Sequence, residues 1–254
     1  TVPSVKFDPA ADVRLNVSIQ LKSDTKWAKA GFEVKHEQFA INDRLATAFS
    51  PMSLKTGREA DMKEALEWFD IVKPHFFRAP LDNDKGFGNW IAKDWKNNRL
   101  DSPEIVTVKP LDAKRNADGT VTVTTTQECR YANGKITTDY VYTMDADGSV
   151  DFSATYTPEG QLPPLPCIGN TFLMDKDMTR LSWYGQGLQD SYVDRLEATG
   201  IGRWTSSVDQ EYVHYPRPQS SGNHEQTVTL SLTDAKGRGY TVTTVNATPF
   251  AFSV

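Results

Sequence analysis

Paired carboxylates are the residues of this sequence most open to a chemical role, but no motif fixes that role. Asp82 and Asp84 lie two residues apart, and Asp190 and Asp194 lie four apart. Glycoside hydrolysis uses two carboxyl groups at a set separation, one of them with a raised pKa, and sequence spacing does not give that separation. The sequence contains no G-x-S-x-G nucleophile elbow, no P-loop and no G-x-G-x-x-G fingerprint. Serine hydrolase, nucleotide hydrolase and dinucleotide-dependent functions therefore have no support.

The histidines and cysteines do not indicate a metal centre. The four histidines are His36, His75, His214 and His224. No two of them have the H-x-H or i, i+4 spacing that would place both on one face as ligands. His214 and His224 frame a loop rich in Pro, Ser and Gly, and we expect both to be polar groups on the surface. Cys129 and Cys167 form no C-x-x-C motif, so neither a zinc site nor a disulfide framework is predicted.

Residues 78–86, R-A-P-L-D-N-D-K-G, look like a calcium-binding loop. However, the glycine does not fall at the position that the D-x-D-x-D-G pattern requires, and the distal glutamate is absent. We therefore interpret the segment as a turn rich in Asp and Asn, held by its own side chains. No metal ligand is assigned.

Aromatic residues next to polar ones suggest a carbohydrate surface as strongly as they suggest a core. Trp90, Trp95, Trp183, Trp204, Tyr212 and Tyr215 have Asn, Asp or Arg residues close by in the sequence. Flat aromatic faces stack on sugar rings, and the polar neighbours can bond hydroxyl groups. The same residues would equally suit a β-sandwich core rich in aromatic side chains.

Composition bounds the class of protein. The chain has 254 residues, 38% of them hydrophobic, and a formal net charge of −5. This is enough to bury a core, and it disfavours nucleic acid and anionic membranes as partners, since both attract basic surfaces. No segment approaches the roughly 20 apolar residues of a membrane span, and residues 1–4 do not begin a signal peptide.

Alternating apolar residues predict a mainly β protein. Val13 to Leu21 places five aliphatic residues on one face, and Phe32 to Phe39 is expected to pair with it. Further strands are predicted at 105–108, 121–126, 136–142, 150–156, 227–232 and 240–245. Turn signals separate several of them, namely Asp118-Gly119, Asn133-Gly134, Asp147-Gly148 and Lys236-Gly237. The pattern indicates antiparallel hairpins in a β-sandwich.

One segment departs from this pattern. Between Arg58 and Val72, apolar residues recur at helical spacing, and Lys63 and Glu67 stand four apart on the other side. We predict a short amphipathic helix there, ended by Pro74.

Three ordered motifs resemble the large bacterial β-galactosidases of glycoside hydrolase family 2. Residues 77–86 match the F-R-A-P-x-D-N-D-x-G signature of that family. The second motif comprises residues 183–187 (W-Y-G-Q-G), 191–195 (S-Y-V-D-R) and 202–204 (G-R-W), and the third comprises 210–213, 215–219 and 222–223. Residues 11–39 are similar to the end of the Ig-like domain that precedes the terminal domain in this family.

The resemblance implies a domain arrangement and a function. Residues 1–45 would be the C-terminal part of an Ig-like domain, and 46–75 an atypical linker with a short helix. Residues 76–254 would be most of the terminal domain, a large antiparallel sandwich of the galactose mutarotase-like type, truncated at its C-terminus. The family's catalytic glutamates lie on an upstream TIM barrel, so the resemblance implies no catalytic residue here and a chain inactive by itself.

The expected function is therefore that of a non-catalytic C-terminal portion of a retaining β-galactosidase, which shapes the rim of the active site and stabilises the enzyme. Its partners would be the barrel of the same polypeptide and a β-galactoside, in a homo-oligomer of the bacterial cytoplasm or periplasm. The resemblance implies no cofactor in this chain, because the Mg and Na of the full-length enzymes are bound elsewhere. The alternatives are a free-standing carbohydrate-binding module and a mutarotase-like epimerase.

The resemblance also carries over to single residues. A mobile loop bordering the galactose site in this family aligns with Lys85, Gly86, Phe87, Gly88 and Asn89, where the glycines allow hinge motion. We expect Arg78, Asp82, Asn83 and Asp84 to organise the turn before that loop. Departures occur at Leu188, Asp190 and Val193, where the family has Pro, Glu and Pro. The helical pattern of residues 59–72 also stands where the family has strands.

Overall fold

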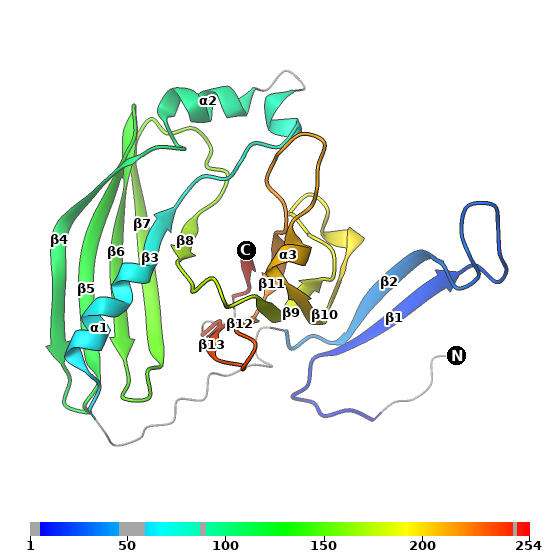
Figure 1. Ribbon diagram of the computed structural model, residues 1–254, viewed down its shortest axis with the longest axis horizontal. Helices are drawn as coiled ribbons and strands as arrows, with labels where there is room; N and C mark the ends of the chain where they lie inside the picture. Colours follow the sequence, from blue (N-terminus) through cyan, green and yellow to red (C-terminus); the bar gives the residue numbers. More distant parts are fainter. Residues whose placement is uncertain (1–5, 46–58, 87–89, 246–247) are drawn as a thin grey trace. The chain divides into compact units, whose positions relative to one another are not determined.

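The computed structural model describes residues 6–45, 59–86, 90–245 and 248–254, and it is mainly β (Figure 1). The chain divides into two compact units. One comprises residues 1–51, 176–216 and 221–254, and the other comprises 52–175 and 217–220. The prediction of a mainly β fold built from antiparallel sheets is confirmed. No helix among the described residues is long and apolar enough to cross a membrane.

The second unit is built on a four-stranded antiparallel meander, in the order β4-β5-β6-β7. The strands are β4 (Glu104–Arg115), β5 (Val121–Arg130), β6 (Gly134–Met144) and β7 (Val150–Gly160). The predicted turns join them. Gly119 and Gly148 have φ of +89° and +83°, a conformation that favours glycine and suits tight hairpins. Alternation along β5 and β6 then places Val121, Val123, Tyr140 and Tyr142 on one buried face.

A helix covers that buried face, as predicted for the segment between residues 58 and 72. Helix α1 (Met62–Trp68) begins at Asp61, whose carboxylate accepts the N–H groups of Lys63 at 2.7 Å and Glu64 at 3.1 Å. The Tyr142 hydroxyl donates to the carbonyl of Ala65 at 2.6 Å, which ties the helix to the sheet. The helix continues into a 3-10 turn, η1 (Phe69–Ile71), before β3 (Val72–His75) begins. The prediction that Pro74 ends the helix is therefore wrong, since Pro74 lies within β3.

Sequence reasoning missed several short elements of the second unit. Strand β3 pairs with β8 (Gly169–Phe172), and helix α2 (Ile91–Asn98) follows a 3-10 turn, η2 (Asn83–Lys85). Elements of four to eight residues carry too few side chains to show a clear period. Helix α2 also has no side-chain N-cap, and it ends at Arg99 with φ of +59°, without the usual glycine.

The first unit contains a second four-stranded sheet, in the order β10-β9-β12-β13. Its strands are β9 (Arg180–Gly187), β10 (Gly200–Ser207), β12 (Thr229–Thr233) and β13 (Gly239–Thr243). A two-stranded sheet of β11 (His224–Thr227) and β14 (Phe250–Phe252) packs beside β9, and the smaller helical pieces are η3 (Leu196–Ala198) and α3 (Val208–Glu211). Leu181, Trp183 and Phe252 form a core cluster between these sheets.

The predicted N-terminal hairpin also belongs to the first unit. Strand β1 (Val13–Gln20) pairs antiparallel with β2 (Glu33–Asn42). Gln38 joins the hairpin to β10, since its side chain accepts the N–H of Ile201 at 2.9 Å and donates to the carbonyl of Ile201 at 2.8 Å. One face of the hairpin, with Val17 and Ile19, stays exposed.

Candidate functional site

The turn after β3 is fixed by an ion pair. The Arg78 Nη1 atom donates to Asp84 Oδ2 at 2.6 Å, and Nη2 lies 3.4 Å from Oδ1. The same Oδ2 accepts the backbone N–H of Leu81 at 2.6 Å. The side chains of Arg78 and Asp84 are 23% and 13% exposed, so water competes weakly for these bonds. A single carboxylate thus holds both the guanidinium and the backbone of the turn.

Helix α2 contacts this turn through Trp95. The Arg78 guanidinium lies over the Trp95 ring at 5.4 Å, a cation–π contact. Trp95 is buried, and its indole N–H donates to the carbonyl of Pro164 at 2.8 Å. Before the turn, Phe76 is buried against Cys129 and Ile136 of the meander. The turn is therefore held by the buried Phe76 before it and by the contact of Arg78 with Trp95.

Asp82 and Asn83 do not take part in this network through their side chains. Both are exposed, and the Asp82 carboxylate lies 4.0 Å from Arg217, whose side chain is 82% exposed. Such an exposed pair contributes little to stability. Asp82 serves the turn through its backbone, since its carbonyl accepts the N–H of Lys85 at 3.2 Å.

The predicted carbohydrate-proximal loop is described only at its beginning. Lys85 ends η2 and is exposed, and Gly86 has φ of −134°, which any residue adopts. A Cβ atom at Gly86 would lie 3.5 Å from the Asp82 carbonyl, an ordinary contact. Phe87, Gly88 and Asn89 lie outside the described residues. The role of residues 85–89 at a galactose site stays a prediction.

The interpretation of His224 as a surface group is wrong. His224 is fully buried, and its Nε2 atom lies 2.6 Å from Oε2 of Glu211, which is itself 7% exposed. The rings of Trp183 and Phe252 cover the imidazole at 4.4 and 5.0 Å. Loop composition misled here because β11 starts at His224 and carries it under the rings. His214, in contrast, is exposed and contacts Tyr212 edge-on.

This buried pair does not have the geometry of a mutarotase-like centre. That chemistry needs a His acid and a carboxylate base on opposite sides of a substrate. Glu211 and His224 instead bond each other, without a gap between them. Gly222, with φ of +72°, brings the chain back against the Glu211 carbonyl, where a Cβ atom would lie at 2.8 Å. The pair therefore joins the two ends of the loop between α3 and β11, since Glu211 ends α3 and His224 begins β11.

The second and third family motifs meet in the first unit. The Arg195 guanidinium donates to the Asp190 carboxylate, five residues earlier in the chain. Ser191 donates its N–H to the Asn223 carbonyl at 2.6 Å, and the Asn223 amide donates to the Ser191 carbonyl at 2.7 Å. The D-S-Y-V-D-R segment and the G-N dipeptide, 32 residues apart between Ser191 and Asn223, therefore form one structural feature.

The aromatic residues divide between core and surface. Trp183 is buried and Trp204 is partly buried in the core cluster between the sheets of the first unit, and Trp95 is buried on α2. Trp90 and Tyr212 are exposed. With the set divided in this way, the carbohydrate interpretation of these aromatic residues stays a prediction.

Neither cysteine is suited to nucleophilic chemistry. Both thiols are free, and Cys129 is buried on β5, as strand packing predicts. Burial raises the pKa of Cys129 and of Cys167 to about 11, so both thiols stay protonated. Within the described ranges, no group of three His, Cys, Asp or Glu side chains is placed to hold a metal ion.

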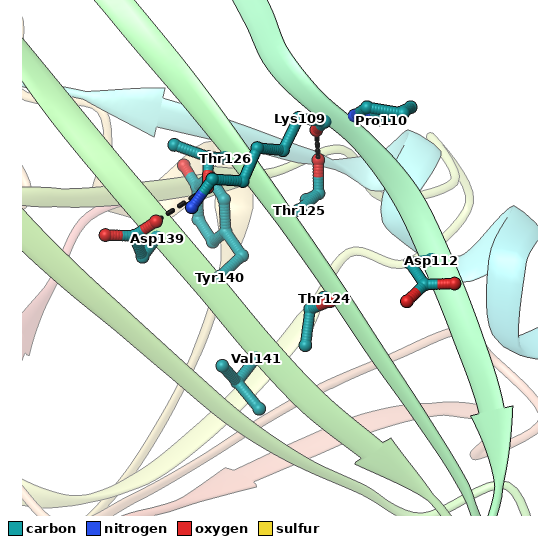
Figure 2. A pocket seen from close by; sticks show the side chains of 9 residues that line it. All are labelled: Lys109, Pro110, Asp112, Thr124, Thr125, Thr126, Asp139, Tyr140 and Val141. Carbon is teal, nitrogen blue, oxygen red and sulfur yellow. Dashed lines mark hydrogen bonds between the residues drawn. The ribbon is translucent and has the colours of Figure 1, made fainter.

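A pocket that sequence analysis did not anticipate lies where β4 bulges beside β5 (Figure 2). Its volume is about 330 Å³. It is lined by Lys109, Pro110, Asp112, Thr124, Thr125, Thr126, Asp139, Tyr140 and Val141. The pairing register of β4 shifts twice here, between Thr107 and Lys109 and between Lys109 and Asp112. A bulge leaves no periodicity signal in the sequence, which is why the pocket was missed.

Comparison with known proteins gives two adjacent family matches. The family model described as "Beta galactosidase small chain" matches residues 46–254, and the model described as "Beta-galactosidase, domain 4" matches residues 1–42.

Individual relatives agree with these matches. Beta-galactosidases of Priestia megaterium and Streptococcus thermophilus are 26% and 27% identical over 93% of this chain. A beta-galactosidase of Bifidobacterium adolescentis, BgaC, is 26% identical over 96% of it. The chain spans about a quarter of the length of these relatives, 25%, 25% and 26% respectively.

Proposed function

Because this chain belongs to the β-galactosidase small chain family, we propose that it is the non-catalytic C-terminal portion of a β-galactosidase. The complete enzyme would hydrolyse terminal β-galactosides with retention. The observation that carries the proposal is coverage: relatives named as beta-galactosidases match 93% of this chain along only 25% of their own length. The nucleophile and acid/base carboxylates would then lie on the catalytic barrel in the remaining three quarters.

The proposed contribution of this chain is to border the active site and to stabilise the enzyme. Support comes from the rigid turn before residues 85–89. The Arg78–Asp84 pair and the Trp95 platform give the loop a fixed starting point. A loop anchored at its base can order around a substrate at less entropic cost than one anchored nowhere.

The first test is the activity of the purified 254-residue chain on a chromogenic β-galactoside. We expect no turnover above the buffer rate, because the chain would supply no nucleophile. Measurable hydrolysis that survives repeated purification would overturn the proposal.

The second test asks for the rest of the enzyme. Sequencing the gene upstream of Thr1 should reveal a barrel with two glutamates, either in the same reading frame or in a neighbouring one. If that portion is expressed and mixed with this chain, hydrolysis should appear only in the mixture. Hydrolysis by the barrel portion alone at the full rate would contradict the proposed stabilising role.

The turn can be tested in the same mixture. Asp84→Asn removes the carboxylate that holds Arg78 and the Leu81 N–H, so we expect a raised KM for the galactoside. Asp82→Asn is the matched control, because among the described residues its exposed carboxylate has only the distant Arg217 as a partner. Equal effects of the two variants would contradict the role of the turn.

A further inference from the structure

We propose that the pocket at the β4 bulge is a binding site for a neutral, polyhydroxylated ligand of the size of one sugar ring. The inference does not depend on the proposed function, since it concerns what the second unit binds by itself. The volume of the pocket, about 330 Å³, falls at the lower end of the range of small-molecule sites.

The pocket exists because β4 leaves its register with β5. Lys109 is opposite Thr126 and Asp112 is opposite Thr124, so the four residues 109–112 of β4 lie beside the three residues 124–126 of β5. The Thr125 hydroxyl donates to the Lys109 carbonyl at 2.7 Å and holds the bulge in place. Bulges of this kind redirect side chains and commonly adjoin functional sites.

The lining side chains offer hydrogen-bonding capacity that the protein does not use. Among the described residues, neither the Lys109 ammonium nor the Asp112 carboxylate has a hydrogen-bond or ion-pair partner. Asp139 is held by the Thr126 hydroxyl, which donates to its Oδ1 atom at 2.6 Å, and its other oxygen remains available. Figure 2 shows the Lys109 side chain extending across β5 toward Asp139. The lining thus offers one ammonium donor and two carboxylate acceptors.

This combination of donors and acceptors matches the chemistry of vicinal hydroxyl groups. Each hydroxyl both donates and accepts, so a ring bearing several of them can bond an ammonium and a carboxylate at once. Pro110 and the half-exposed Val141 supply apolar surface for the C–H face of such a ring. A purely apolar ligand would leave the charged groups without partners, at a cost in affinity.

The charges of the lining disfavour anionic ligands and a metal ion. One ammonium and two carboxylates give the pocket a formal charge of −1, which repels phosphate and carboxylate ligands. Two aspartates without a third acidic or imidazole group fall short of a metal centre among the described residues. A neutral polyol can bond groups of either charge without repulsion.

Titration of the full chain with D-galactose, followed by amide NMR spectra, tests the proposal. We expect a Kd on the order of 1 mM, which is typical of a single small ring. The shifted amides should be those of residues 109–112, 124–126 and 139–141. D-galacturonate, the same ring with a carboxylate, should bind about tenfold more weakly because of the pocket's charge.

Variants then locate the site. Lys109→Met and Asp112→Asn should each weaken binding about tenfold or more, the loss expected when one charged hydrogen-bond partner is removed. Both side chains are exposed, so neither change should alter the circular dichroism spectrum. Asp151→Asn is the matched control, an exposed carboxylate on β7 outside the pocket, and its affinity should equal that of the unaltered chain.

Three results would overturn the proposal. The first is the absence of shifts at galactose concentrations on the order of 50 mM. The second is unchanged affinity in Lys109→Met and Asp112→Asn. The third is a loss in Asp151→Asn as large as theirs, which would place binding elsewhere. None of these results bears on hydrolysis by the assembled enzyme, so failure here is distinguishable from failure of the proposed function.

Discussion

The meander of the second unit and the hairpin of the first unit show the same sequence pattern with opposite outcomes. Both alternate apolar and polar residues, and both fold into the predicted antiparallel strands. In the meander the apolar face lies under α1, and Tyr140 and Tyr142 are 1% and 0% exposed. In the hairpin, Ile19 and Phe39 remain 59% and 53% exposed. Alternation therefore identifies the apolar face of a strand, but an element elsewhere in the chain determines whether that face is buried.

A matched pair of phenylalanines should give the largest difference between the two regions. Phe69→Ala removes a ring buried between Tyr140 and Tyr142, so we expect a loss of about 3–5 kcal/mol in the free energy of unfolding. Phe39→Ala removes a half-exposed ring and should cost within about 0.5 kcal/mol. Urea denaturation followed by tryptophan fluorescence measures both. Equal losses would mean that the hairpin face is covered in solution.

The ion pair of the turn should give the next largest effect. Arg78→Met and Asp84→Asn each leave a partly buried partner unsatisfied, at a cost of about 1–3 kcal/mol. The double variant should cost less than the sum of the two, because each single change already breaks the pair. Asp82→Asn is the control and should leave the urea midpoint unchanged. Additive losses would indicate that the two side chains act separately.

The junction of the hairpin with β9 should be sensitive to acid. Burial raises the pKa of Asp12, but hydrogen bonds from Arg14 and Tyr184 outweigh it, and the net pKa lies below the ordinary 3.8. Because the folded pKa is the lower one, the stabilisation is complete above pH 3.8 and is lost as the pH falls through the folded value. The urea midpoint of the first unit should therefore fall in this window.

Two variants check the assignment of this acid effect. Asp12→Asn should remove that part of the pH dependence and lower the midpoint at neutral pH, since the Tyr184 hydroxyl lies 2.5 Å from the carboxylate. Burial raises the pKa of Tyr184 to about 12, so its hydroxyl remains a donor throughout. Asp43→Asn, at the exposed partner of Arg14, should keep the profile of the unaltered chain. An unchanged profile in Asp12→Asn would assign the acid effect to other groups.

The smallest effects are expected at exposed ion pairs, where the two regions should not differ. Lys63 lies 3.4 Å from Glu67 on α1, and Lys29 lies 2.7 Å from Asp24 in the hairpin connection. All four side chains are more than half exposed, so water and salt screen the pairs. Lys63→Ala and Lys29→Ala should each leave the urea midpoint unchanged. A clear shift in only one of them would extend the contrast between the regions to their surfaces.

Local patterns predicted the regular part of the fold well. The β5–β6–β7 strands and their turns follow from alternation and Asx-Gly dipeptides, and α1 follows from its 3.6-residue period. The short elements, such as α2 and β8, do not, because packing rather than propensity stabilises pieces of four to eight residues.

The candidate sites were predicted less completely. The sequence singled out Arg78 and Asp84 as residues of one turn, but not the indole of Trp95 beneath them. His214 and His224 looked alike in a polar loop, and only the structure separates an exposed imidazole from one buried against Glu211. The pocket depends on a register shift between strands, a relation that no local window contains.

By itself, the sequence determined the β class of this protein, its hairpins, its helix and its resemblance to the β-galactosidases. These properties depend on neighbours along the chain, where backbone geometry fixes which side chains share a face. The tertiary structure alone decided which apolar face is buried, which histidine is paired and where β4 opens a pocket. Those properties arise from contacts between residues distant in sequence, and side-chain types set the chemistry of such contacts without fixing the partner.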